Sequence, residues 1–145
     1  MPRDLKLVLL LFALAACCCG CARQAESNLL PVAGRVTLGK SPLPTGAVSF
    51  RPDAAKGNKS LHHPTDTIDG EGRYELFTPG QAGAPPGWYK VVVHATEPTG
   101  DSGKASPGMP KSIIDLSYNA EKTTPLAVEV IADAPAGHYD LHLDK

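Results

Sequence analysis

The chain has 145 residues, of which 42% are apolar and 20% are charged, and its formal net charge is −1. This length is typical of one domain, and the composition is that of a globular protein rather than a disordered one. The near-neutral charge argues against a nucleic-acid partner, which requires a basic surface. The 14 glycines and 14 prolines disfavour long helices and indicate an all-β protein with many turns.

The first sixteen residues have the pattern of an export signal. A start that contains basic residues precedes ten apolar residues, Leu7–Ala16. A helix that crosses a bilayer needs about 20 apolar residues, so this run is too short to span one. We therefore predict a signal peptide over residues 1–16, a tether over residues 17–30 and one folded domain over residues 31–145.

The four cysteines follow this segment directly, at positions 17, 18, 19 and 21, so no disulfide can form within the predicted domain. The run Leu14-Ala15-Ala16-Cys17 resembles the lipobox of bacterial lipoproteins. The resemblance implies cleavage before Cys17, a diacylglycerol on its sulfur and an acyl chain such as palmitate on its amine. Two or more chains anchor a protein stably to a membrane, whereas one chain does so only marginally.

The lipobox also suggests a location. The residue after Cys17 is Cys18 rather than an aspartate, and by the sorting rules of proteobacterial lipoproteins this favours the outer membrane. The domain would then lie in the periplasm or at the cell surface. The fate of Cys18, Cys19 and Cys21 stays open between free thiols, mutual pairing and further acylation.

The rest of the chain contains short segments in which apolar and polar residues alternate, a period of two that is typical of β-strands. Turns rich in glycine separate them, and Asp69–Gly72 is the strongest hairpin-turn signal. In the long segment over residues 97–125, only residues 113–118 carry enough apolar side chains to be ordered by burial. Seven strands are predicted: Val32–Gly39, Ala47–Phe50, Thr65–Ile68, Arg73–Thr78, Trp88–Thr96, Leu126–Ile131 and His138–Leu143.

Four segments resemble the transthyretin-like domain, also called the prealbumin-type or carboxypeptidase regulatory-like domain, over about residues 32–143. They are VAGRVTLGKSPLPTGAVSF, TIDGEGRYEL, PPGWYKVVV and the final pair PLAVEVIAD and GHYDLHL. The family's Thr-Asp before the turn is here Thr67-Ile68-Asp69, so the spacing is altered. The resemblance implies a seven-stranded antiparallel β-sandwich. Together with the lipobox, it is similar to surface lipoproteins of planctomycete-like bacteria.

Histidines near the C-terminus are the candidate metal ligands. On a strand, His138, Asp140 and His142 would share one face, with the two imidazoles about 7 Å apart along the chain. This spacing is within reach of one transition metal. The polar outward face of a half-buried strand explains the same pattern without a metal. His62 and His63 in a polar loop, and Asp66, Asp69 and Glu71 around one turn, are weaker candidates, because a polar loop and an acidic turn need no metal to explain them.

Apolar residues in loops are the candidate contacts with a partner. Trp88 lies on the outward face of its predicted strand, together with Lys90 and His94. Long segments without secondary structure are often functional, and residues 97–118 contain Met109, Ile113, Ile114 and Leu116. The alternative is that these last residues cover the end of the core.

No sequence signature of catalysis is present: the chain has no G-x-S-x-G and no H-E-x-x-H. It also lacks the Tyr-Arg-Gly-Ser ending of transthyretin-like hydrolases that open 5-hydroxyisourate. We therefore predict a lipid-anchored, non-catalytic module without a cofactor, with a structural role or a role in binding an envelope protein or polysaccharide. The alternatives are a periplasmic metal-binding lipoprotein and, less favoured, a small-molecule hydrolase on the same fold.

Overall fold

The computed structural model describes residues 28–97 and 110–145, and in these residues the regular secondary structure is almost wholly β-strand. The predicted all-β class is therefore confirmed. Each of the seven predicted segments contains a strand of three or more residues, and three further strands have two residues each. The strands are β1 (Ala33–Leu38), β2 (Ser41–Pro42), β3 (Gly46–Pro52), β4 (Thr65–Ile68), β5 (Arg73–Glu75), β6 (Phe77–Thr78), β7 (Gln81–Ala82), β8 (Gly87–His94), β9 (Ala127–Val130) and β10 (Leu141–Leu143).

Two short 3₁₀ helices, η1 (Ala54–Lys56) and η2 (Leu116–Asn119), complete the described secondary structure. Within residues 28–97 and 110–145, no helix has the length and apolar character needed to cross a membrane. The predicted signal peptide and Cys17 lie outside the described residues. Leu30, which we placed in the tether, is paired with the domain: it exchanges two backbone hydrogen bonds of 2.9 Å with Ala84.

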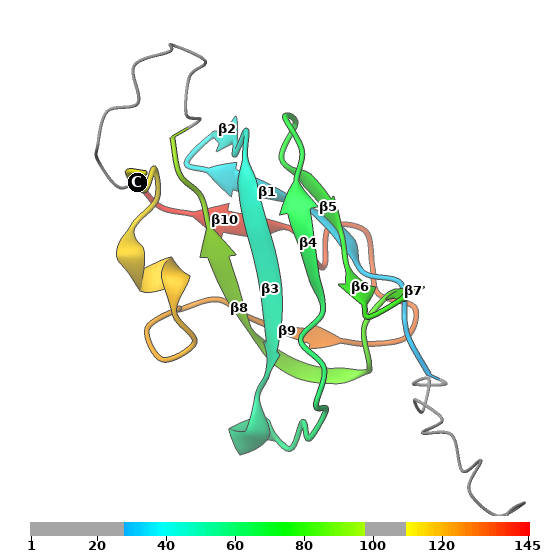
Figure 1. Cartoon of the computed structure of the whole chain (residues 1–145). Coiled ribbons are helices and arrows are strands. Elements are labelled where there is room, and N and C mark those ends of the chain that lie inside the picture. The colour runs from blue at the N-terminus through cyan, green and yellow to red at the C-terminus, as the bar shows by residue number, and fades with distance from the viewer. Residues whose placement is uncertain (1–27, 98–109) are drawn as a thin grey trace, which may run out of the picture.

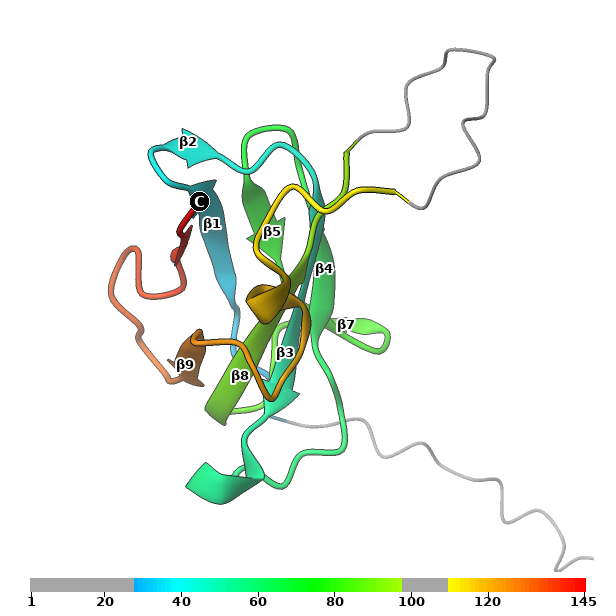
Figure 2. The same cartoon turned by 90° about the vertical axis from the view of Figure 1, so that its left-hand side faces the viewer.

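The strands form two sheets (Figures 1 and 2). In the first sheet the order is β10-β1-β2, and β5 pairs with the first half of β1. The second sheet has the order β7-β6-β4-β3-β8-β9. Figure 2 shows β1 and β2 in one layer and β3, β4 and β8 in the other. This arrangement leaves one face of each sheet turned toward the core.

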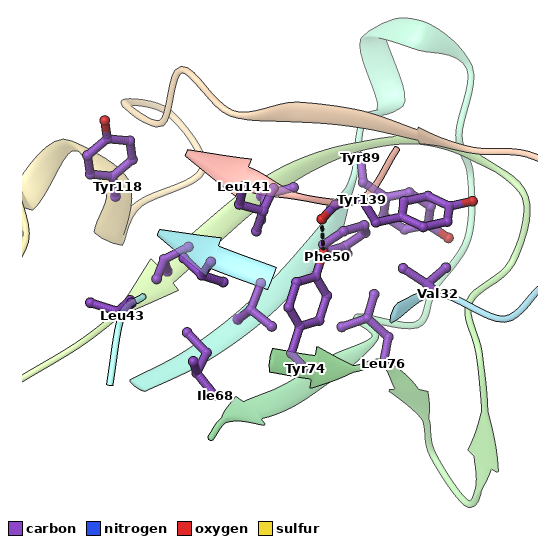
Figure 3. Close-up of a cluster of buried hydrophobic side chains, with 14 of the residues drawn as sticks. Val32, Leu43, Phe50, Ile68, Tyr74, Leu76, Tyr89, Tyr118, Tyr139 and Leu141 are labelled. Carbon is purple, nitrogen blue, oxygen red and sulfur yellow. Dashed lines mark hydrogen bonds between the residues drawn. The ribbon is translucent and has the colours of Figure 1, made fainter. Parts of the chain in front are cut away.

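The core contains the residues that the alternation of the sequence places inward. Val48 and Phe50 of β3, and Tyr89, Val91 and Val93 of β8, are fully buried. In Figure 3 the aromatic rings lie between the sheets, and the ring centroid of Phe50 is 5.7 Å from that of Tyr89. Burying side chains of this size stabilises the fold by about 1.5–3 kcal/mol each. The core prediction is therefore confirmed for these two strands.

One strand pair is parallel, whereas the sequence indicated an antiparallel sandwich. β1 and β10 run in the same direction, with Val36 beside Leu141 and Leu38 beside Leu143. The backbone N–H of Gly39 extends the pair by donating to the carbonyl of Leu143 over 2.7 Å. The connection after β9 carries the chain from the second sheet to the first before β10 begins. In the first sheet β10 then runs in the same direction as β1, so the expectation of a wholly antiparallel fold was wrong.

The predicted strand Arg73–Thr78 is divided in the structure. Its first part, β5, pairs with β1, while its last part, β6, pairs with β4 and β7. Leu76 lies at the division, is fully buried, and donates its backbone N–H to the carbonyl of Val32 over 2.9 Å. Burial keeps alternating through this point, but hydropathy does not, because Phe77 is exposed and Thr78 is buried.

The turn before β5 forms where it was predicted, at Asp69–Gly72. One carboxylate oxygen of Asp69 accepts the backbone N–H groups of Glu71 and Arg73, both over 2.8 Å. Gly72 has a φ of 79°, and a Cβ there would lie 2.5 Å from the carbonyl oxygen of Val36. The position therefore requires glycine both for its backbone conformation and for the close approach of β1.

Candidate functional site

Of the three candidate metal ligands near the C-terminus, two bond to β1 and one bonds to β9. The Nδ1 atom of His142 lies 2.8 Å from the hydroxyl of Thr37 on β1. Asp140 accepts the backbone N–H of Arg35 over 2.9 Å. His138 lies in the turn before β10, not on a strand, and its Nε2 atom is 2.8 Å from a backbone carbonyl oxygen of β9.

The expectation that His138 and His142 share one strand face is therefore wrong, because the strand begins only at Leu141. The chain turns over residues 135–140, where the backbone N–H of His138 donates to the carbonyl of Pro135 over 3.1 Å. In the described part of the chain, no three His, Cys, Asp or Glu side chains gather in a way that could hold a metal ion.

The two carboxylates of the acidic turn, Asp69 and Glu71, are paired with one arginine, Arg73. The guanidinium of Arg73 contacts a carboxylate oxygen of Asp69 at 3.0 Å and one of Glu71 at 2.8 Å. Hydrogen bonds from the backbone and then the side chain of Arg73 lower the pKa of Asp69. The pKa of Arg73 is raised in turn, chiefly by its hydrogen bond to Asp69. This cluster stabilises a turn, because one guanidinium holds two carboxylates, and its charges sum to one negative unit.

The apolar residues that precede η2 pack against the protein rather than facing a partner. Ile114 is only 7% exposed and belongs to the core, and Ile113 is partly buried against it. The backbone N–H of Ile113 donates to the carbonyl of Ala95 over 3.1 Å, which fixes this segment beside the end of β8. The alternative reading, that these two residues cover the core, is the one that the structure supports. Leu116 is 68% exposed, and Met109 lies outside the described residues.

Trp88, at the start of β8, is the candidate contact residue that lies at a hollow in the surface. Its side chain is half-buried, and the ammonium of Lys56 lies 3.5 Å above the centre of its ring. Such a cation–π contact stabilises by about 0.5–1 kcal/mol at an exposed site. The carbonyl of Trp88 accepts the backbone N–H of Asp53 and the side-chain amide of Asn58, both over 2.9 Å. Trp88 is therefore the residue through which the loop after β3 is attached to β8.

That loop is ordered by its own polar side chains. The carboxylate of Asp53 accepts the backbone N–H of Ala55 over 3.1 Å and so caps η1, which ends at Gly57 with a φ of 86°. The side chain of Asn58 is buried, and its oxygen accepts the backbone N–H of Ser60 over 3.0 Å. Both carboxylate and amide are thereby used to shape the loop, which we call the η1 loop and define as residues 51–63, the last two residues of β3 included.

The η1 loop and the start of β8 enclose an open hollow of about 510 Å³. Trp88 and Glu129 both line it, and they lie side by side because β8 and β9 pair Trp88 with Glu129. Two ammonium groups, one carboxylate and an indole can together bind a polar or anionic ligand. The lining includes Lys56, Asn58, Lys59, Pro86, Trp88 and Glu129.

Sequence reasoning identified Trp88 but missed the other residues of this hollow. Lys56 and Trp88 are 32 positions apart, and no local sequence pattern predicts that the ammonium of Lys56 lies over the ring of Trp88. Glu129 reaches the hollow only through the register of β8 and β9. Comparison of the chain with protein-family models, curated proteins and solved structures found no match in any of the three.

Proposed function

We propose that this chain is a lipid-anchored, non-catalytic module of the bacterial cell envelope. The observation that carries the proposal is the run Leu14-Ala15-Ala16-Cys17 directly after ten apolar residues. Lipid on Cys17 would hold the domain at a membrane, with the outer membrane favoured by Cys18, and the domain would lie in the periplasm or at the cell surface.

We further propose that the two sheets form a sandwich of the transthyretin-like type. The segment that resembles the family's opening motif supplies β1, β2 and β3, and the altered Thr-x-Asp segment supplies the end of β4 and the following turn. These placements support the assignment because Gly34, Gly46 and Gly72 of the motifs stand where a Cβ would collide with a backbone oxygen. Fold alone does not define a function, so the function must be argued from a site.

The site that supports a binding role is the hollow at Trp88. Trp88 on β8 and Lys56 on the η1 loop present an indole and a positive charge where strands of the second sheet hold the loop, and loops held by a rigid sheet commonly carry recognition. We propose that the domain binds another envelope component, a protein or a polysaccharide, and that the hollow and the η1 loop are a surface through which it meets the envelope. No cofactor is required for such a role.

The experiment is an intact-mass measurement of the full chain purified from the membranes of a bacterium that produces it. We expect a protein that starts at Cys17 and carries the mass of a diacylglycerol and an acyl chain. Cys17→Ala should lose both the added mass and membrane retention, and the matched variant Cys18→Ala should keep the thioether-linked lipid. An unmodified chain that starts at Met1 in the parent protein would overturn the proposal.

A further inference from the structure

The η1 loop carries an excess of positive charge at one end of the sandwich. It contains the basic residues Arg51, Lys56 and Lys59 and one acidic residue, Asp53. Because the carboxylate of Asp53 is buried as the cap of η1, the three basic groups dominate the surface of the loop. Nearby negative charge comes from Glu129 in the hollow and from Asp133 in the connection after β9.

The same loop exposes a large apolar side chain. Leu61 is 91% exposed, more than either of the other exposed large hydrophobic residues of the described chain, Phe77 and Leu116. It follows Lys59 and Ser60, which line the hollow above Trp88. A leucine at a loop tip, a tryptophan with a polar edge and flanking lysines are the residue types that associate with the boundary between lipid headgroups and acyl chains.

The described chain begins at this end of the molecule. Leu30 pairs with Ala84, and the next two residues, Pro85 and Pro86, line the hollow. In Figure 1 the blue start of the described chain and η1 both lie at the lower end, and the C-terminus lies toward the opposite end. A lipid on Cys17, only 13 positions before Leu30, would therefore attach near the end that carries the η1 loop.

We propose that the η1 loop docks on the anionic phospholipid surface of the membrane, with Leu61 at the acyl boundary and Lys56, Lys59 and Arg51 among the headgroups. The inference rests on the proposed lipid anchor, which would hold this end of the domain within reach of the bilayer. The docked loop would fix the orientation of the domain, so that the end with β2 and the C-terminus faces away from the membrane.

Trp88 provides the measurement, because it is the single tryptophan of the sequence. The full chain, as purified from membranes, is reconstituted into vesicles of phosphatidylcholine alone or with phosphatidylglycerol, each containing a spin-labelled lipid. Quenching of Trp88 fluorescence reports how closely the hollow approaches the bilayer. We expect strong quenching only with phosphatidylglycerol, and its loss in 1 M salt, where charges are screened within about 3 Å.

Two substitutions test the loop without disturbing the contact of Lys56 with Trp88. Lys59→Glu should reduce the ratio of docked to undocked domain by roughly tenfold or more, since each basic residue near an anionic surface contributes about fivefold. Leu61→Ser should reduce it by roughly tenfold through lost apolar burial. The matched controls Lys122→Glu and Leu116→Ser, exposed positions outside the η1 loop, should leave the quenching unchanged.

The outcomes separate this inference from the proposed function. If Cys17 carries lipid but the quenching of Trp88 is the same with and without phosphatidylglycerol, the proposed docking of the η1 loop is overturned and the proposed anchor stands. Missing lipid mass would overturn the anchor, and charge-dependent quenching in that protein would still support the loop. Quenching unchanged by Lys59→Glu and Leu61→Ser would overturn the inference. A Trp88 response to a soluble anionic polysaccharide, with none to phosphatidylglycerol, would also overturn it and assign the surface to glycan binding.

Discussion

The hydroxyl of Tyr74 offers a direct test of how β5 is held to the turn before β10. It donates a 2.6 Å hydrogen bond to the backbone carbonyl of Tyr139, linking β5 to the turn before β10, and both residues are buried (Figure 3). Tyr74→Phe removes the donor and leaves the carbonyl in the core. We expect this to lower the free energy of unfolding by about 1–3 kcal/mol, since a buried acceptor loses its partner without gaining water.

Thermal unfolding followed by circular dichroism measures the effect. A domain of this size loses roughly 4 °C per kcal/mol, so Tm should fall by about 4–12 °C. Tyr118→Phe is the matched control: the oxygen of Tyr118 accepts the N–H of Asp144 at the exposed C-terminus, where water can replace it. Equal Tm values for Tyr74→Phe and the parent protein, or equal losses in the two variants, would refute the reasoning.

The same hydroxyl predicts behaviour at alkaline pH. Burial, and secondarily the charge of Asp140, raises the pKa of Tyr74 above the value near 10 of an unfolded tyrosine. The folded protein therefore disfavours the ionised phenol, and its stability is complete below about pH 10 and declines as the pH rises further. In Tyr74→Phe the decline of Tm above pH 10 should be shallower than in the parent. An identical alkaline slope would contradict this assignment.

Three further predictions concern other parts of the fold. Gly34→Ala should abolish or severely impair folding, because its Cβ would lie 2.3 Å from a backbone oxygen. Gly70→Ala is the control and should fold, because its Cβ would meet nothing within 4 Å. Expression and circular dichroism distinguish the two variants. Ile114→Ala should cost about 2–4 kcal/mol in denaturant unfolding and Leu116→Ala less than 0.5, and equal costs would contradict the core role of the former. The pKa of Asp69 is lowered in the folded protein, so its carboxylate stabilises the fold above the unfolded pKa near 3.9, and this stabilisation is lost as the pH falls through the folded pKa. In Asp69→Asn, Tm should therefore fall less steeply at acidic pH than in the parent protein.

Local alternation was sufficient to predict much of the core. The inward faces of β3 and β8 follow from a period of two that the chain keeps for several residues, so Phe50 and Tyr89 were placed correctly. The turn at Asp69 was also predictable, because aspartate and glycine suit turn geometry by themselves. Both features depend on residues that are neighbours in the sequence.

Features set by distant residues were not predictable. The break at Leu76 and the parallel pairing of β10 depend on which strand lies alongside, and hydropathy carries no information about that. The hollow at Trp88 has the same origin, because Lys56 and Glu129 come from a loop and a strand far apart in the chain. Lipidation of Cys17 stays a prediction, since that residue lies outside the described part of the structure.

The parallel pair of β1 and β10 has a consequence for the time course of folding. Val36 and Leu141 are neighbours in the sheet but are 105 positions apart in the chain, so closing this pair requires nearly the whole domain. Contacts of such long range slow folding, because the entropy of a large loop is lost before the contact forms. The first sheet therefore cannot be completed until β10 has been synthesised. For a protein that crosses a membrane before it folds, as we propose here, this order leaves the first sheet incomplete until translocation has delivered β10.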